Sequence, residues 1–351
     1  MYIIIAILAF GLLIFIHELG HFLAAKASGV KVTEFALGMG PRLVHITRGE
    51  TDYSLRALPI GGFCAMEGED ESSEDPRAFN NQSVIKRLLI LCAGSFMNFL
   101  LGFLLLLIVY APSQGYSSPV IAGFFPDCPY EGALQEGDTV YRINGQRVYF
   151  TSNFSELLSI DEDGTVDMEL RRDGEKILLE DYHIVPVPYE DENGKTVMKY
   201  GIYFSIEEGN IFNLIKYSWY NCLDFVRMVR MGLSQLIHGK ASMSDMTGVI
   251  GIVDIINETG QSAPTKAQGL ENVLYVVAFI AVNLSVMNML PIPALDGGHI
   301  VTMLISWGYE KITGKKPDPR IEGYIHLVGL VLLLCLMGLV FYNDIVRIIR
   351  R

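Results

Sequence analysis

Three residues near the N-terminus have the types and the spacing that metal chemistry requires. His17, Glu18 and His21 form an HExxH pattern within the segment HELGH. On a helix, His17 and His21 stand one turn apart on the same face, so both imidazoles can reach one ion, and Glu18 lies about 100° round the axis. The pattern predicts a divalent metal site with Glu18 placed to act on a water beside the ion.

A hydrolytic zinc site needs a third protein ligand and a fourth position for water. Asp296 is the acidic residue of the sequence NxxPxPxLDGG at 288–298, where two prolines interrupt an apolar run. A carboxylate there would complete a His₂–carboxylate set, although an Asp before Gly-Gly is also a common turn or cap residue. His299 is a competing ligand, which we rank lower as a packing or outer residue. Zinc lowers the pKa of its water and polarises the scissile carbonyl, so Glu18 is expected to move the proton from that water to the leaving amine.

The composition places this chemistry in a membrane. Half of the 351 residues are hydrophobic and 19% are charged, against about 25% charged in soluble chains. The net charge of −12 argues against nucleic-acid binding, which needs a basic face. Apolar runs long enough, or nearly so, to form spanning helices occur at 1–16 (resuming at 22–25), 88–111, 272–290 and 325–342. The third run is broken at its prolines, and broken backbone at membrane depth is tolerated only beside protein or a water cavity.

A polar insert separates the second and third runs. Asn144-Gly145 and Asp173-Gly174 are strong hairpin signals, and a short helix fits 152–160, so we expect a small mixed α/β domain. Residues 211–237 favour an interfacial amphipathic helix, with a fifth spanning helix as the alternative. The expected parts are 1–28 (first spanning helix, with HExxH), 29–84 (inner loop and membrane-associated strands), 85–112 (second spanning helix), 113–208 (inserted domain), 209–268 (interfacial helix region), 269–308 (third spanning helix, broken) and 324–346 (fourth spanning helix).

Basic flanks predict the orientation in the membrane. Lys26 and Lys31 follow the first apolar run, and Lys86 and Arg87 precede the second, so the loop between them is expected on the inner side and the insert outside. The basic loop 309–323 agrees with this orientation. The arginines at the C-terminus disagree, which leaves the side of the tail open.

The order of these motifs resembles the site-2 protease family of intramembrane zinc metalloproteases, and most of all its bacterial regulator-of-sigma-E protease branch. The insert, with Gly137-Asp138 and Ile143-Asn144-Gly145, resembles a PDZ domain in a single copy, whereas the best-known members of this branch carry two. The segments that carry the family resemblance are HELGH, Gly38–Pro41, Pro59–Phe63, Ala93-Gly94 with Asn98, and the stretch at 288–298.

The resemblance implies that His17, His21 and Asp296 hold Zn²⁺, that Glu18 is the catalytic base, and that Asn288 contributes to substrate binding. The fold it implies is an α-helical polytopic membrane protein with about four transmembrane helices, a membrane-associated β-hairpin region and one inserted PDZ-like α/β domain. The implied substrates are single-pass membrane proteins, such as anti-sigma factors or remnant signal peptides, cut in regulated intramembrane proteolysis. The implied location is a bacterial plasma membrane, with the PDZ-like domain outside and the active site towards the cytoplasm.

A transmembrane substrate must unwind before its peptide bonds can be cut. Residues 31–66 alternate well enough to form short strands, whose exposed edge could hold an unwound substrate as an added strand. Gly40 in this region is therefore a candidate substrate-binding residue; the alternative is a packing loop in which Gly40, Gly61 and Gly62 only make turns. Two other functions compete. A non-catalytic PDZ-bearing scaffold would leave the intramembrane His, Glu and Asp unexplained. An ion transporter would usually show inverted repeats, which this sequence lacks.

Overall fold

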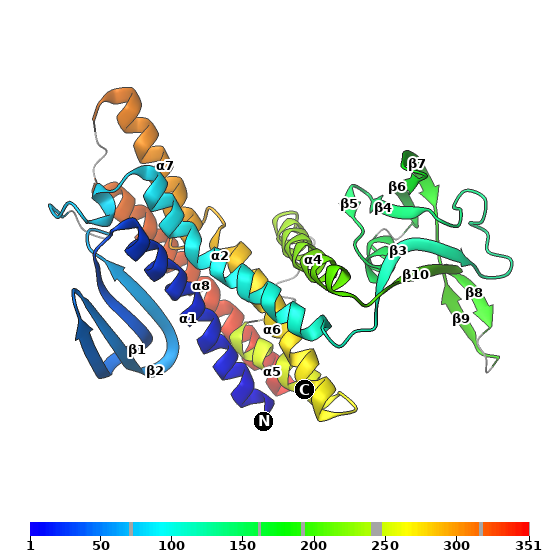
Figure 1. Cartoon of the computed structure of the whole chain (residues 1–351), viewed down its shortest axis with the longest axis horizontal. Helices are drawn as coiled ribbons and strands as arrows, with labels where there is room; N and C mark the ends of the chain where they lie inside the picture. The colour runs from blue at the N-terminus through cyan, green and yellow to red at the C-terminus, as the bar shows by residue number, and fades with distance from the viewer. Residues whose placement is uncertain (70–72, 161–162, 191–193, 240–247, 316–318, 351) are drawn as a thin grey trace. The chain divides into compact units, whose positions relative to one another are not determined.

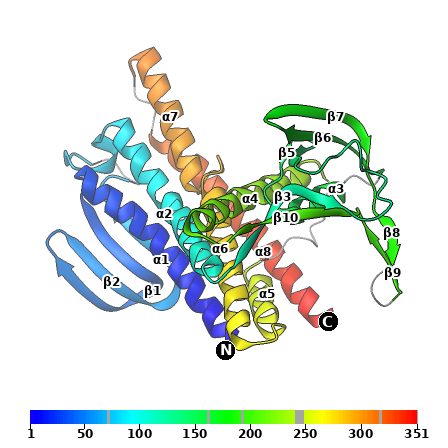
Figure 2. The same ribbon diagram turned by 45° about the vertical axis from the view of Figure 1, so that its right-hand side comes forward.

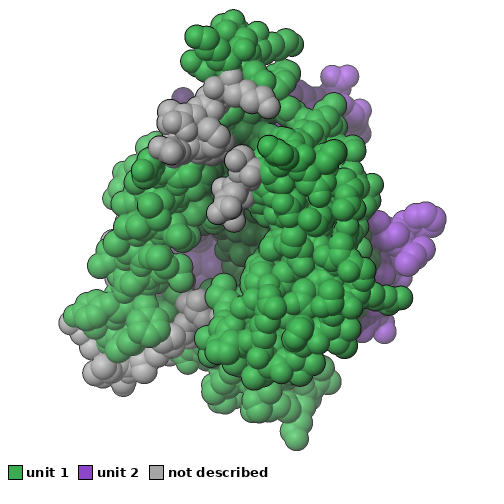
Figure 3. Space-filling view, turned by 90° about the vertical axis from the view of Figure 1, so that its left-hand side faces the viewer, with its two compact units in different colours: residues 1–109, 225–351 green, residues 110–224 purple. Residues whose placement is uncertain are grey.

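A computed structural model describes residues 1–69, 73–160, 163–190, 194–239, 248–315 and 319–350. The chain forms two compact units, one of residues 1–109 and 225–351 and one of residues 110–224, coloured separately in Figure 3. The insert boundaries expected from the sequence, 113–208, fall inside the second unit. Residues 316–318 of the basic loop, the C-terminal Arg351, and 240–247 of the expected interfacial region lie outside the described residues.

The first unit consists mainly of long helices (Figure 1). Four of them, carrying the four apolar runs, are long and apolar enough to cross a membrane, which confirms that prediction for the described residues. The helix α4 begins in the second unit and is not among these four, so its interfacial placement stays a prediction. The helices are α1 (Tyr2–Ser28), α2 (Val84–Tyr110), α4 (Ile211–Ile237), α5 (Val249–Gln261), α6 (Lys266–Asn288), α7 (Asp296–Thr313) and α8 (Pro319–Arg350), with a short 3₁₀ turn at Phe79–Asn81.

Two apolar clusters hold α1 in place at its opposite ends. Near the N-terminus, Tyr2 and Ala6 pack with Ile256 of α5 and with Val273 and Val277 of α6. Near the other end of α1, a second cluster gathers side chains from α1, α2, α7 and the strands that follow α1; its members include Ala25, Val30, Val32, Met66, Ile90, Leu91, Ile300 and Met303. The middle of α1, which carries HELGH, therefore lies between two packed regions.

The alternating segment 31–66 forms two strands, β1 (Val32–Arg48) and β2 (Thr51–Met66), that lie beside α1 in both views (Figures 1 and 2). Their register is that of a sheet folded back on itself. Phe35 of β1 pairs with Cys64 on one side and with Tyr53 on the other, while Val44 pairs with Leu55. The first half of β1 thus lies between the two halves of β2, and the end of β2 forms an outer edge of the sheet.

The third apolar run is broken where its prolines predict. Helix α6 ends at Asn288 and α7 begins at Asp296, with residues 289–295 between them in non-helical backbone. Ala294 has a φ of 77°, in the left-handed region that side chains other than glycine rarely adopt. This connection determines where Asp296, the first residue of α7, is placed.

The second unit is a small α/β structure. Its main sheet has the strand order β10-β3-β4-β6-β7, with β5 paired to β4, and β8 and β9 form a separate antiparallel pair. Both hairpins expected at Asn144-Gly145 and Asp173-Gly174 are present, since β4 pairs with β5 and β6 with β7. The elements are β3 (Gly115–Phe124), β4 (Thr139–Ile143), β5 (Gln146–Arg147), α3 (Thr151–Leu158), β6 (Thr165–Arg172), β7 (Glu175–His183), β8 (Val187–Glu190), β9 (Thr196–Lys199) and β10 (Ile202–Glu208).

Candidate active site

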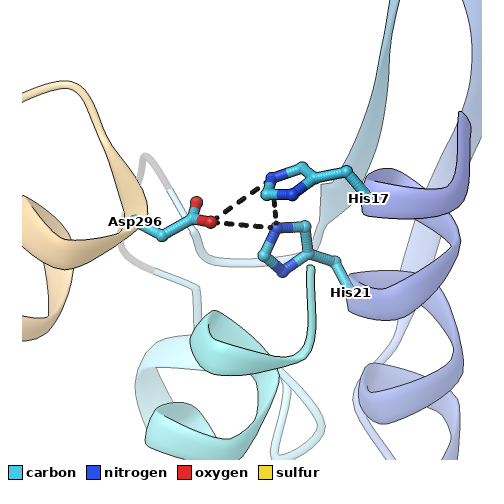
Figure 4. A group of neighbouring side chains, drawn as sticks. All are labelled: His17, His21 and Asp296. Atoms are coloured by element: carbon cyan, nitrogen blue, oxygen red, sulfur yellow. Dashed lines mark hydrogen bonds and ion pairs between the residues drawn. The ribbon is translucent and has the colours of Figure 1, made fainter. Parts of the chain in front are cut away.

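The structure brings His17, His21 and Asp296 together from α1 and the start of α7 (Figure 4). The His17 and His21 Nε2 atoms are 3.2 Å apart, and the Asp296 Oδ2 atom lies 3.3 Å and 3.5 Å from them. Three ligands about 2.0 Å from a tetrahedral ion are about 3.3 Å apart, so this triangle has the size that zinc requires. Within the described residues, Asp296 Oδ2 is a buried oxygen without a hydrogen bond, as expected of an atom that binds a cation.

The second nitrogen of each imidazole faces α2. The Nδ1 of His21 lies 2.8 Å from the carbonyl oxygen of Ile90, which can only accept, so Nδ1 carries the proton and Nε2 keeps its lone pair for an ion. The Nδ1 of His17 lies 3.5 Å from the side-chain amide of Asn98, which is fully buried. The Oδ1 of Asn98 has no hydrogen-bond partner among the described residues, and rotating this amide by half a turn would let Oδ1 accept from His17.

Helices α1 and α2 meet at two glycines beside the imidazoles. A Cβ atom on Gly94 of α2 would lie 2.3 Å from His21 Nε2 and 2.7 Å from His17 Cε1. A Cβ atom on Gly20 of α1 would lie 2.4 Å from the Ala93 carbonyl oxygen. Neither position has room for a side chain, so the backbones themselves are in contact. This contact explains how two imidazoles fit between the helices.

Glu18 lies against the outer edge of the folded sheet. A Cβ atom on Gly62 of β2 would lie 3.5 Å from Glu18 Cγ, and Cys64 is close enough for the carboxylate to affect its titration. Burial, and after it the Glu18 carboxylate, raises the pKa of the Cys64 thiol far above its usual range. Among the described residues, the cluster of side chains that could hold a metal ion consists of His17, His21 and Asp296, without Cys64.

The other residues singled out in the sequence lie at different distances from this triad. Asn288, the last residue of α6, places its Nδ2 3.3 Å from His17 Nε2. The ring of His299 stacks instead on His326 of α8. Gly40 lies at a bend of the folded sheet, with a φ of 83° and a carbonyl that accepts from Arg56. Among the described residues, Gly40 contacts Arg56 and Leu58 rather than the triad, so its role in substrate binding stays a prediction.

Sequence reasoning had only a family resemblance to point to Gly94 and Asn98, and it had no reason to select the Ile90 carbonyl or His326. A glycine in an apolar helix and a histidine in another carry no pattern of their own. The signal that could have found Gly94 is its type, because small residues let membrane helices approach closely.

Comparison with known proteins places the chain in a class. The profile of peptidase family M50 matches residues 5–336. The chain belongs to this family, the site-2 proteases, as the resemblance of its motifs predicted. It is accordingly a zinc metalloprotease of the site-2 type and a multi-pass membrane protein.

Individual relatives align with this chain over nearly their full lengths. A protein of Clostridium acetobutylicum, whose name assigns it provisionally to the zinc metalloproteases, is 38% identical over 98% of this chain and 97% of its own. A similarly named protein of Clostridium perfringens is 38% identical over 99% of both chains. The regulator of sigma-W protease RasP of Bacillus subtilis is 27% identical over 97% of both chains.

Proposed function

We propose that His17, His21 and Asp296 bind the zinc ion of this protease, that Glu18 is its catalytic base, and that it cuts single-pass membrane proteins. The observation that supports the metal site is the triangle of two imidazole nitrogens and one carboxylate oxygen, with sides of 3.2–3.5 Å. Its ligands come from two elements far apart in the sequence, so their meeting is a property of the fold.

Zinc in such a site lowers the pKa of water and polarises the scissile carbonyl. The chain's own residues do the rest. Glu18, next to His17 on α1, accepts the proton of the attacking water and delivers it to the leaving amine, as a general base and then a general acid. His21 is fixed by the Ile90 carbonyl, and Asn98 fixes His17 once its Oδ1 faces Nδ1. Asn288, beside His17, is placed to bind the substrate backbone near the bond that is cut.

The outer edge of the folded sheet supports a substrate in extended form. Residues 62–66 at the end of β2 pair with β1 on one side, and Gly62 lies against Glu18. An unwound segment added along this edge would form backbone hydrogen bonds and would pass close to the catalytic base. The substrate class therefore consists of single-pass helices that can unwind locally, including anti-sigma factors and remnant signal peptides. The relative named for sigma-W regulation is consistent with the first of these.

We also propose that the second unit is a PDZ-like domain on the outer side of a bacterial plasma membrane, with the active site towards the cytoplasm. Strand β10 lies at one end of the main sheet, and a PDZ domain binds peptides along such an edge. Deleting 115–205 is expected to change which membrane substrates are cut while leaving turnover of an unstructured peptide intact. Complete loss of that turnover would assign the second unit to the catalytic machinery.

The metal site and the base are tested separately. Purified Glu18→Gln protein is expected to keep stoichiometric zinc and to lose cleavage of a model single-pass substrate, because the ligands remain and the base is gone. Asp296→Ala is expected to lose zinc, because it removes one of three protein ligands. Zinc is measured by elemental analysis and cleavage in detergent.

Glu271→Gln is the matched control, since it makes the same change on an exposed residue of α6. It is expected to retain both zinc and cleavage. An active Glu18→Gln protein would remove Glu18 from its proposed role. Unchanged zinc in Asp296→Ala would move the third ligand elsewhere, with His299 as the next candidate.

A further inference from the structure

The connection that delivers Asp296 is held by a side chain from another helix. His326 of α8 accepts a hydrogen bond through Nδ1 from the backbone N–H of Ala294, at a distance of 3.2 Å. Ala294 is the residue with the left-handed φ of 77°, two positions before Asp296. A non-glycine residue keeps such a conformation only when its surroundings stabilise it. Within the described residues, the His326 ring is the side chain that accepts from the Ala294 N–H.

The accepting Nδ1 determines the state of the whole imidazole. A ring nitrogen that accepts has no proton, so Nε2 of a neutral His326 carries it. That Nε2 lies 3.2 Å from the Thr302 hydroxyl oxygen of α7, which accepts a hydrogen bond from it. The ring also stacks on His299 of α7, with centroids 3.8 Å apart and planes 8° from parallel. His326 therefore contacts both the connection and the first turns of the helix that carries Asp296.

A second contact lies one turn further along α8. A Cβ atom on Gly329 would lie 2.3 Å from the Cβ of Pro293 and 2.7 Å from its carbonyl oxygen. The backbone of α8 therefore touches the connection directly, at the residue before Ala294. Most large apolar side chains of α8 are exposed, including Leu327, Leu332 and Leu339. The helix also contacts α5, where the buried Asp344 carboxylate accepts hydrogen bonds from the backbone N–H groups of Gly248 and Gly251.

We propose that His326 and Gly329 of α8 form a clamp on residues 293–294 that positions the Asp296 carboxylate for zinc. His326 is a positioning residue, since it acts through the backbone N–H of Ala294. The inference rests on the proposed role of Asp296 as a ligand. The last spanning helix thereby becomes part of the active site without contributing a ligand to it.

Variants of His326 in the full-length protein test which contact matters. His326→Ala removes both hydrogen bonds. His326→Asn places an amide oxygen where Nδ1 stood and keeps the bond from Ala294, whereas His326→Gln places its amide near Nε2 and keeps only the contact to Thr302. We expect zinc affinity, measured by chelator competition, to fall roughly tenfold in the Ala and Gln variants and to stay within about threefold in the Asn variant, because outer contacts of metal ligands are typically worth 10–100-fold.

Two further measurements do not depend on enzyme activity. In chelator-treated protein, the peptide covering 290–298 is expected to exchange its amide hydrogens faster in His326→Ala than in the wild type. In cobalt-substituted protein, the visible absorption bands are expected to change. Gly329→Ala should give the same two changes. Gly338→Ala, on the same helix, is its matched control, because a Cβ atom on Gly338 would have no described atom within 4 Å.

The outcomes separate the clamp from the metal site itself. If Asp296→Ala loses zinc but His326→Ala and Gly329→Ala keep wild-type affinity, exchange and cobalt spectrum, the clamp is wrong and the metal site stands. If Asp296→Ala keeps its zinc, the proposed metal site is wrong. Recovery by Gln rather than by Asn would also overturn the clamp, because it would assign the effect to the Thr302 contact.

Discussion

Replacing Gly94 by alanine should disable the metal site while α2, the helix that contains Gly94, stays folded. The new methyl group would lie 2.3 Å from His21 Nε2 and 2.7 Å from His17 Cε1. An ordinary carbon–nitrogen contact is about 3.5 Å, so the His21 ring must move by roughly 1 Å. Metal–ligand distances tolerate only about 0.2 Å, and a 1 Å misplacement of a reacting group typically costs about a hundredfold in rate. Alanine is a better helix former than glycine, so α2 itself should remain intact.

The assay compares zinc affinity, by chelator competition, with cleavage of a single-pass substrate in detergent. Gly94→Ala is expected to lose about a hundredfold in each, equivalent to about 2.8 kcal/mol at 1.4 kcal/mol per factor of ten. Gly102→Ala is the control on the same helix. Its Cβ would crowd a Val282 methyl at 2.7 Å, so it disturbs the helix packing without touching an imidazole. It should lower thermal stability somewhat and keep zinc affinity.

A Gly94→Ala protein that binds zinc within twofold of wild type would refute the reasoning. It would mean that α1 and α2 separate by about an ångström at negligible cost, and the close backbone contact would then have no role in shaping the site.

Three further predictions concern other parts of the chain. Asn98→Leu should weaken zinc binding about tenfold, because it removes the buried amide whose Oδ1 would accept from His17 Nδ1; unchanged affinity in chelator competition would contradict this. Asp138→Asn should lower the free energy of unfolding in urea by about 2 kcal/mol, because the fully buried carboxylate accepts two bonds from Arg172, which raise the pKa of that guanidinium. Burial opposes ionisation of Glu34, but bonds from Ser54, Arg56 and Arg42 outweigh it and lower the pKa of Glu34. The ionised Glu34 carboxylate therefore stabilises the fold above its unfolded pKa of about 4.3, and this stabilisation is lost as the pH falls through the lower folded pKa. In a plot of melting temperature against pH, Glu34→Gln should therefore reduce the fall on the acid side.

Local patterns predicted much of the fold because hydropathy and turn chemistry are local properties. The spanning helices followed from apolar runs, and Asn144 and Asp173 adopt the left-handed φ of 47° and 50° that their hairpin turns require. The folded sheet of β1 and β2 could not be read in the same way. Alternation identifies a strand, but it does not show that Phe35 pairs with Cys64 and Tyr53 at once.

In the candidate site, too, the local motifs could be predicted from the sequence and the contacts between distant residues could not. HELGH is visible because its spacing is that of one helical turn, and the break before Asp296 is visible because proline interrupts a helix. Their meeting across the fold depends on packing that no short pattern encodes. The Ile90 carbonyl is a backbone group, and such groups have no sequence signal at all. His326 contacts a connection 32 residues earlier in the chain, so only the structure shows it.

The glycine contact between α1 and α2 also affects any attempt to redesign this protein. Leucine or alanine in place of glycine ordinarily favours insertion of a helix into a bilayer. At Gly20 and Gly94 the same change would push two backbones apart where they now touch. A redesign guided by insertion energy alone would therefore produce a chain that enters the membrane more readily and catalyses less.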